Sequence, residues 1–327
     1  MSKKTQGHFE VDKIIDFNKI ASKDRIEESD YSLLDNNNRF IQLKYKPPKE
    51  KDESGILAQP GIFSIKIDKY DEPYLHKLDL PEEKIVEDYQ FAQRIQTFIT
   101  SFFSKLHIYK KHGITQPRRG ALIYGPAGTG KTCSIRLAIK DVIKDGKTMV
   151  IFWSTDRYKS GFIKQIFEFI DYGKVVEKVV LVVEDIGGSE YDKGIRESES
   201  SLLSILDNAE GTFKLPTAIL ATTNFPETLL ANLTDRPGRF DEKINVGFPT
   251  SDNRVKLLRF FLKEKVTKEF EEEIRNKKYD EFSAAHLKEI ILRAELNDLT
   301  YMAATKQLLE EQQQYKNYFK KKNKVGI

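Results

Sequence analysis

The sequence predicts a three-layer α/β fold, a parallel sheet between two layers of helices, followed by a separate helical unit. A glycine-rich loop at residues 125–132 stands between a predicted strand and a predicted helix. Beyond it, apolar strands alternate with amphipathic helices as far as Pro249, a pattern typical of a parallel sheet covered by helices. After Pro249 only helical patterns remain.

The composition bounds the class of protein. A length of 327 residues exceeds the usual single core, so two or three domains are expected. The single cysteine, Cys133, excludes an internal disulfide framework, and the five histidines show no ligand spacing. A net charge of +4 is too small to indicate nucleic-acid binding by itself. With no apolar run of membrane-spanning length and no signal-peptide core at the N-terminus, we expect a cytoplasmic protein.

Residues 1–85 predict a small β-containing domain. Residues 9–20 have loose helical periodicity, whereas 39–46 and 61–67 alternate like strands. The pattern is compatible both with a partner-binding domain and with an extension that packs on the next domain.

Residues 86–250 predict the nucleotide-binding α/β domain. A helical pattern covers residues 87–111, a short apolar strand at 119–124 leads into the glycine-rich loop, and a helix follows at 134–144. The later elements are strands at 149–153, 179–183, 217–222 and 243–246, and helices at 162–170 and 200–209.

Residues 251–327 predict a helical lid with a basic tail. The helices are expected at 253–265, 268–276, 283–294 and 301–318. The tail is either a solvated terminus or a contact for an acidic partner or nucleic acid. Its lysines are Lys316, Lys320, Lys321, Lys322 and Lys324.

The glycine-rich loop fits the phosphate-binding pattern G-x-x-x-x-G-K-[ST] at every fixed position. Glycines let successive backbone N–H groups point at phosphate oxygens. Lys131 can reach the β- and γ-phosphates, and the Thr132 hydroxyl can ligate Mg²⁺. The loop consists of Gly125, Pro126, Ala127, Gly128, Thr129, Gly130, Lys131 and Thr132.

Two carboxylates, Glu184 and Asp185, follow the fully apolar strand at 179–183. The carboxyl end of a central parallel strand is where ligands of open α/β sheets bind. One carboxylate can therefore hold Mg²⁺, for which we select Glu184, while the other polarises the attacking water.

At residues 114–261 the sequence resembles the AAA family of the AAA+ ATPases. Four blocks match in order: PRRGALIYG at 117–125, SLLSILD at 201–207, ATTN at 221–224 and LTDRPGRFD at 233–241. The resemblance implies binding and hydrolysis of Mg·ATP. It also implies a ring of identical subunits, usually a hexamer.

The resemblance also assigns catalytic roles. Asn224, at the end of the strand next to the carboxylate strand, would orient the attacking water or the γ-phosphate. Arg236 and Arg239 would be arginine fingers that reach the nucleotide of the neighbouring subunit. Their alternative is an ion pair with Asp235 or Asp241 that merely fixes the turn.

Two positions depart from the family pattern. The usual order is Asp then Glu, whereas this chain has Glu184 then Asp185, and Ala127 stands where proline is common. Asp185 is one methylene shorter than glutamate, so its hold on the water differs.

The family's central-pore loop corresponds to residues 153–162. Tyr158 is the first candidate for the aromatic residue that would grip a translocated polypeptide, and Phe162 is the second. The alternative is that these aromatic side chains pack in the core or on the surface. Residues 187–199 are polar and fit a second pore loop. In the lid, His286 is expected to pack rather than catalyse.

The expected function is therefore that of a ring-forming ATPase that remodels or threads a protein substrate, with an adaptor as a further partner. The competing expectations are a nucleic-acid motor or loader, and a nucleotide-gated assembly protein with weak hydrolysis.

Overall fold

A computed structural model of the chain describes residues 8–16, 39–46, 58–67, 73–80, 90–154, 160–173, 175–187, 205–207, 213–229, 239–263 and 266–324. Two compact units are distinguished. The first contains the sheet and its helices, and the second contains the C-terminal helices together with the loop Gly125–Lys131. Among the residues described, no helix is both long and apolar enough to cross a membrane.

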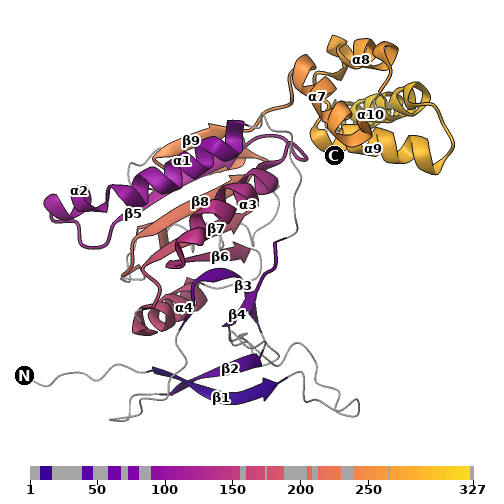
Figure 1. The fold of residues 1–327 in the computed structure, drawn as a ribbon. Coiled ribbons are helices and arrows are strands. Elements are labelled where there is room, and N and C mark those ends of the chain that lie inside the picture. The colour runs from indigo at the N-terminus through magenta and orange to yellow at the C-terminus, as the bar shows by residue number, and fades with distance from the viewer. Residues whose placement is uncertain are drawn as a thin grey trace, which may run out of the picture. The chain divides into compact units, whose positions relative to one another are not determined.

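The first unit is built on a seven-stranded sheet of order β4-β3-β6-β7-β8-β5-β9 (Figure 1). The neighbours β3–β6, β6–β7, β7–β8 and β8–β5 are parallel, and β4 is antiparallel to β3. The strands are β3 (Gly61–Ile67), β4 (Pro73–Lys77), β5 (Arg118–Tyr124), β6 (Thr148–Ser154), β7 (Lys178–Glu184), β8 (Thr217–Thr223) and β9 (Glu242–Asn245).

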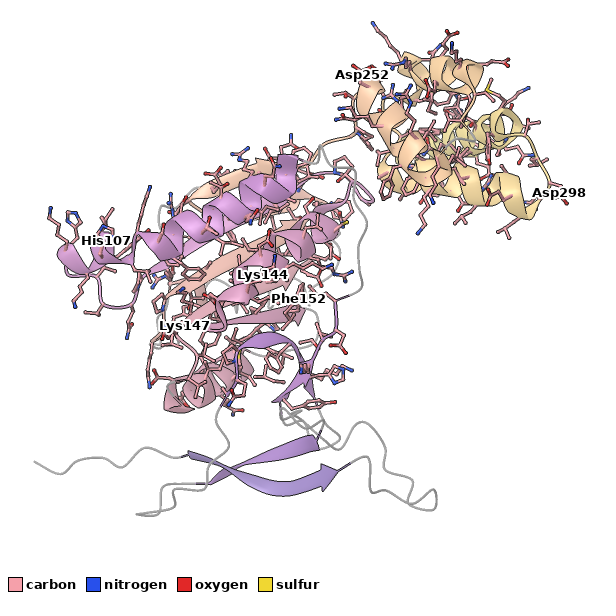
Figure 2. All side chains as sticks on the ribbon, in the orientation of Figure 1. His107, Lys144, Lys147, Phe152, Asp252 and Asp298 are labelled. Carbon is pink, nitrogen blue, oxygen red and sulfur yellow. The ribbon has the colours of Figure 1, made fainter. Side chains whose placement is uncertain are left out.

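Helices cover both faces of this sheet, because its central strands are apolar on both sides. On one face Ile151 and Trp153 of β6 pack with Ile163 and Phe167 of α4 (Ser160–Gly173). The alternate residues, such as Phe152 (labelled in Figure 2), are buried as well. Helices α1 (Gln90–Ser104) and α3 (Lys131–Val142) supply further buried residues, Ile95, Ile99, Ile135 and Ile139, and both lie over the same side of the sheet in Figure 1. The three-layer α/β fold is confirmed.

The N-terminal segment contributes to the same sheet. Strands β3 and β4 are hydrogen-bonded along the β6 edge, so this part of residues 1–85 extends the α/β sheet. The helix expected at residues 9–20 is wrong: His8–Asp16 is strand β1, paired antiparallel with β2 (Arg39–Lys46). Loose periodicity over so short a window does not distinguish a helix from a strand, here one whose paired residues run from Asp16 and Arg39 to His8 and Lys46.

Short elements connect the main ones. Helix α2 (Leu106–Lys111) follows α1, so the continuous helical pattern at 87–111 is two helices. The single turns are η3 (Ile143–Asp145), η4 (Pro226–Thr228) and, in the second unit, η6 (Lys277–Tyr279). Of the helix expected at residues 200–209, only 205–207 are described.

The second unit holds four helices among its described residues: α7 (Ser251–Leu262), α8 (Lys268–Ile274), α9 (Ala284–Leu296) and α10 (Tyr301–Lys324). Threonine and serine caps begin three of them, since the side chains of Thr250, Thr267 and Ser283 accept bonds from backbone N–H groups. A core of its own includes Leu258, Phe270 and Leu287. The expected C-terminal helical part is confirmed.

Candidate functional site

The phosphate-binding loop depends on glycines at positions where no other residue fits. Gly125 has φ 147° and Gly128 has φ 74°, both in the region that favours glycine. A Cβ atom on Gly125 would lie 2.2 Å from the carbonyl oxygen of Val246. One on Gly128 would lie 2.7 Å from the Cβ of Ala285. The loop is therefore approached closely by the backbone of Val246 and by the small side chains of Ser283 and Ala285 in its own unit.

The cation of the loop is Lys131, the first residue of α3. Its ammonium donates to the carbonyl oxygens of Gly125 at 2.7 Å and Pro126 at 2.9 Å, and its side chain is buried. The hydroxyl of Thr129 donates to the same Pro126 carbonyl at 2.9 Å. These two acceptors are neutral carbonyls, and an ammonium can exchange such bonds for stronger ones to phosphate oxygens.

The carboxylate Glu184 ends strand β7, as the sequence predicts, and meets the loop's hydroxyl. Thr132 donates a hydrogen bond to the Glu184 side chain. Burial raises the pKa of Glu184 above its usual range, opposed by the Thr132 bond and the charge of Arg136, while Asp185 raises it further. The Thr132 hydroxyl and the half-buried Glu184 carboxylate together offer two oxygen ligands of the kind that Mg²⁺ prefers. The charge of a bound Mg²⁺ would favour the ionised form of Glu184.

The second carboxylate, Asp185, is oriented by the neighbouring strand. It has φ 52°, a conformation that few residues other than glycine, asparagine and aspartate adopt. Its backbone N–H donates to the Thr222 hydroxyl of β8 at 3.0 Å. The Asn224 amide, just beyond β8, donates to Asp185 Oδ1 at 3.1 Å. The expected adjacency of these two strand ends is confirmed, and it brings the amide and the carboxylate together.

Arg239 has an ion-pair partner that the sequence analysis did not name. This side chain is 5% exposed, and its guanidinium bonds in bidentate fashion to Asp207, a residue that the sequence analysis assigned no role. Asp235 lies outside the described residues. Asp241 forms an ion pair with Arg119, in which Nε and Oδ2 are 3.8 Å apart. Asp207 is the last residue of the block at 201–207. Its place in a block that resembles the family was the sequence feature that could have marked it as a functional residue.

Several predicted residues lie outside the described part of the chain. These are Tyr158, Arg236 and the second pore-loop segment except Gly187 at its start, together with the side chains of Phe162 in α4 and of the lysines at the end of α10. Their roles stay predictions.

Comparison with protein families finds one match. The sequence model of the "ATPase family associated with various cellular activities (AAA)" matches residues 121–248. This range contains the loop, both carboxylates, Asn224 and Arg239.

Relatives with curated descriptions resemble the chain over a similar region. A probable 26S proteasome regulatory subunit 10B of Caenorhabditis elegans is 31% identical over 57% of this chain and 48% of its own length. The 26S proteasome subunit RPT4 of Saccharomyces cerevisiae is 30% identical, over 55% and 43%. A proteasome-activating nucleotidase of Saccharolobus islandicus is 24% identical, over 73% and 66%. The chain thus spans about half the length of the first two relatives.

Proposed function

We propose that this chain, whose residues 121–248 belong to the AAA family of ATPases, hydrolyses ATP in a ring of identical subunits and uses it to remodel a protein substrate. The observation that carries the proposal is the meeting of three segments: Thr132 bonded to Glu184, and Asn224 bonded to Asp185. These bonds bring the first turn of α3 together with the carboxyl ends of β7 and β8, the edge where a nucleotide binds in open α/β sheets.

The binding roles follow from the contacts. Backbone N–H groups of residues 127–132 and the Lys131 ammonium bind the phosphates of ATP. Thr132 and Glu184 hold Mg²⁺, which would neutralise charge on the phosphates when bound.

The hydrolytic roles fall to the pair of Asp185 and Asn224. Asp185 accepts a proton from the attacking water, and Asn224 orients that water or the γ-phosphate. The bond from Asn224 to Asp185 supports this division, because it fixes the shorter carboxylate in a defined orientation.

The ring supplies the remaining catalytic groups. Arg236 and Arg239 act on the nucleotide of the adjacent subunit, which requires a head-to-tail contact that closes, with six subunits expected. For Arg239 this action requires its ion pair with Asp207 to open. Arg236 lies three residues earlier in the sequence.

A protein substrate is the favoured cargo. Relatives whose names refer to the proteasome support this choice, and none of those reported above has a name that refers to nucleic acid. Tyr158, with Phe162 second, grips the polypeptide in the pore. A cytoplasmic location accords with this role.

Turnover by paired variants tests the assignment. Asp185→Asn should bind Mg·ATP but hydrolyse it at least tenfold more slowly, whereas Glu184→Gln should weaken Mg²⁺ binding. Loss of Mg²⁺ binding in Asp185→Asn, with slow hydrolysis confined to Glu184→Gln, would reverse the two roles. Tyr158→Ala should lower the amount of substrate protein unfolded per ATP hydrolysed.

A second candidate function is a nucleotide-gated assembly protein. The order Glu184 then Asp185 favours it, because the shorter Asp185 stands where the family has glutamate. Light scattering during single-turnover hydrolysis separates the two functions. Disassembly at every turnover, without unfolding of any added protein, would support the assembly role.

A further inference from the structure

Arg254 is a buried arginine that the nucleotide chemistry does not use. It lies in α7 with 1% of its surface exposed. Its Nε donates to the carbonyl oxygen of Ile274 at 2.9 Å, and Nη2 donates to the carbonyls of Arg275 and Asn276 at 3.3 and 3.4 Å. The carbonyls of Ile274 and Arg275 lie at the C-terminal end of α8, where helix carbonyls lack intrahelical partners and carry partial negative charge. The Asn276 carbonyl also accepts the Tyr279 N–H at 3.0 Å.

Two further bonds extend from Arg254 beyond α8. Nη1 donates to the carbonyl of Pro249 at 3.2 Å, and Nη2 donates to Asp280 Oδ1 at 3.0 Å. One side chain therefore joins the segment before α7 to the turn before α9. The sequence carries a signal for this buried position, since Arg254 precedes the buried Leu257 and Leu258 at helical spacing.

The segment that contains Pro249 contacts the first residue of the phosphate-binding loop. Val246 is three residues before it, and its carbonyl occupies the space that a side chain on Gly125 would need. A shift of residues 246–249 would therefore move against the first residue of the loop.

Asp280 is connected to the middle of the loop through residues 282–285, which follow it in the chain and contact Gly128. The Phe282 N–H donates to the Tyr279 carbonyl at 2.9 Å. Ser283 then caps α9 together with His286, whose Nδ1 lies 2.7 Å from the Ser283 hydroxyl. The Ala285 N–H donates to the Gly128 carbonyl at 3.2 Å. Gly128 also lies so close to Ser283 that a Cβ would be 2.8 Å from its Oγ.

We propose that Arg254 is a positioning residue for the phosphate-binding loop: it fixes together the two segments that contact Gly125 and Gly128. The inference rests on the proposed binding of ATP at this loop. Arg254 itself touches no part of the loop in the contacts described, so its effect on nucleotide is transmitted through backbone.

The chemistry requires arginine at this position. A guanidinium presents five donors in a fixed plane and can bond carbonyls on several sides at once, whereas lysine offers one compact ammonium. Arg254→Lys keeps the charge beside Asp280 but cannot reach Pro249 and Ile274 together.

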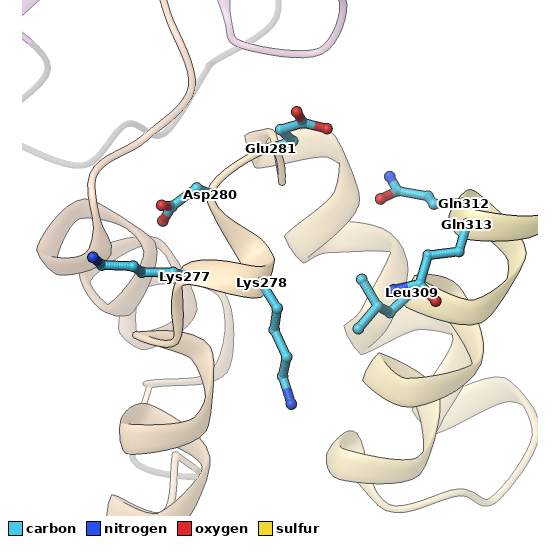
Figure 3. A pocket seen from close by; sticks show the side chains of 7 residues that line it. All are labelled: Lys277, Lys278, Asp280, Glu281, Leu309, Gln312 and Gln313. Atoms are coloured by element: carbon cyan, nitrogen blue, oxygen red, sulfur yellow. The ribbon is translucent and has the colours of Figure 1, made fainter. Parts of the chain in front are cut away.

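Asp280 offers a milder second variant, because it also lines an open pocket of about 260 Å³ (Figure 3). The pocket is bounded by the turn after α8 and by α10, and its other lining residues are Lys277, Lys278, Glu281, Leu309, Gln312 and Gln313. Asp280→Ala therefore removes the bond to Arg254 without creating a buried cavity.

The experiment measures the Kd of the full chain for fluorescently labelled ADP with Mg²⁺, alongside the melting temperature. Arg254→Lys should raise the Kd about tenfold and Asp280→Ala about threefold. Arg259→Lys is the matched control, because Arg259 lies on the same helix but pairs with Glu271 at the surface. Its Kd should stay within twofold of the wild type.

A combined variant separates positioning from simple stability. In a Gly128→Ala background the loop is already displaced, so adding Arg254→Lys should lower the melting temperature again but leave the Kd unchanged. A wild-type Kd in both folded Arg254→Lys and Asp280→Ala would overturn the inference. Equal losses in Arg259→Lys would overturn it as well. Failure of the proposed function is distinct, since the wild-type chain would then not bind the nucleotide.

Discussion

The guanidinium of Arg239 is held by the carboxylate of Asp207, with Nε–Oδ1 at 2.8 Å and Nη2–Oδ2 at 2.6 Å. Arg239 is buried while the Asp207 side chain is 36% exposed. The Asp207 charge also acts on Arg118. Burial lowers the pKa of Arg118 below its ordinary value, and the charges of Asp207 and Asp241 oppose this shift without reversing it. Asp207 therefore bonds to Arg239 and also acts electrostatically on Arg118, at the start of β5.

Asp207→Ala should destabilise the chain, because it leaves the buried Arg239 without its bidentate carboxylate. We expect a loss of about 1–3 kcal/mol, the usual cost of leaving a buried polar group without its partner. Denaturant unfolding measures it. Asp171→Ala is a control that removes a more exposed ion pair, with Lys214. An equal small loss in both variants would contradict the special role of Asp207.

Arg239→Ala tests the shared active site. If Arg239 acts in trans, mixing Arg239→Ala subunits with Lys131→Ala subunits should restore part of the ATPase activity that each lacks alone. Some interfaces then pair an intact loop with an intact arginine. If Arg239 serves only its own chain, no mixing ratio restores activity although the subunits exchange.

Glu184 predicts a dependence of stability on pH. Because burial raises its folded-state pKa above the ordinary 4.5, its contribution to stability is present below that value and is lost as the pH rises through the folded pKa. Without nucleotide or Mg²⁺, Glu184→Gln should therefore melt about 1–4 °C higher than the wild type at pH 7. Below about pH 4 the two should converge, since the carboxyl is then protonated in both states.

Calorimetry from pH 4 to pH 8 checks this prediction, with Glu227→Gln, an exposed glutamate of the same unit, as the comparison. A variant less stable than the wild type at pH 7 would show that the bond to Thr132 outweighs burial. Added Mg·ATP should reverse the order, because the cation favours the ionised carboxylate.

Gly120→Ala should be strongly destabilising. A Cβ at this position would lie 1.8 Å from the carbonyl oxygen of Arg239, a backbone atom that cannot rotate away. Moving residues 239–241 from β5 would also break the bond from the Asp241 N–H to the Gly120 carbonyl, at 2.9 Å. We expect a loss of about 1–3 kcal/mol in unfolding free energy. Gly247→Ala is the control, because the nearest atom to its Cβ is 3.8 Å away.

Lys131→Ala should abolish ATP binding. The variant loses the ammonium that meets the phosphates and leaves the Gly125 and Pro126 carbonyls without that donor. Isothermal titration with Mg·ATP measures the affinity, which should fall at least a hundredfold. Lys144→Ala, whose ammonium pairs with Asp141 on the surface, should bind normally. Near wild-type affinity in Lys131→Ala would remove the basis for the nucleotide site.

The sequence by itself determined the fold class and the phosphate-binding loop. These are local properties: glycines with positive φ, a lysine and a threonine at fixed spacing, and strands apolar on every residue because helices cover both faces. It also placed Glu184, Asp185 and Asn224 at the strand ends, since the carboxyl ends of parallel strands meet at one edge. Helical patterns likewise located the four C-terminal helices.

Only the tertiary structure decided which side chains meet across long separations. Arg239 and Asp207 are 32 residues apart, and no periodicity or motif couples a buried guanidinium to one carboxylate among several. Strand β1 formed where a helix was expected, because pairing with β2 outweighs weak local periodicity. The links from Arg254 to Pro249 and Asp280, and from Gly128 to Ala285, also arise from packing, in which backbone carbonyls take the partners that the fold brings within reach.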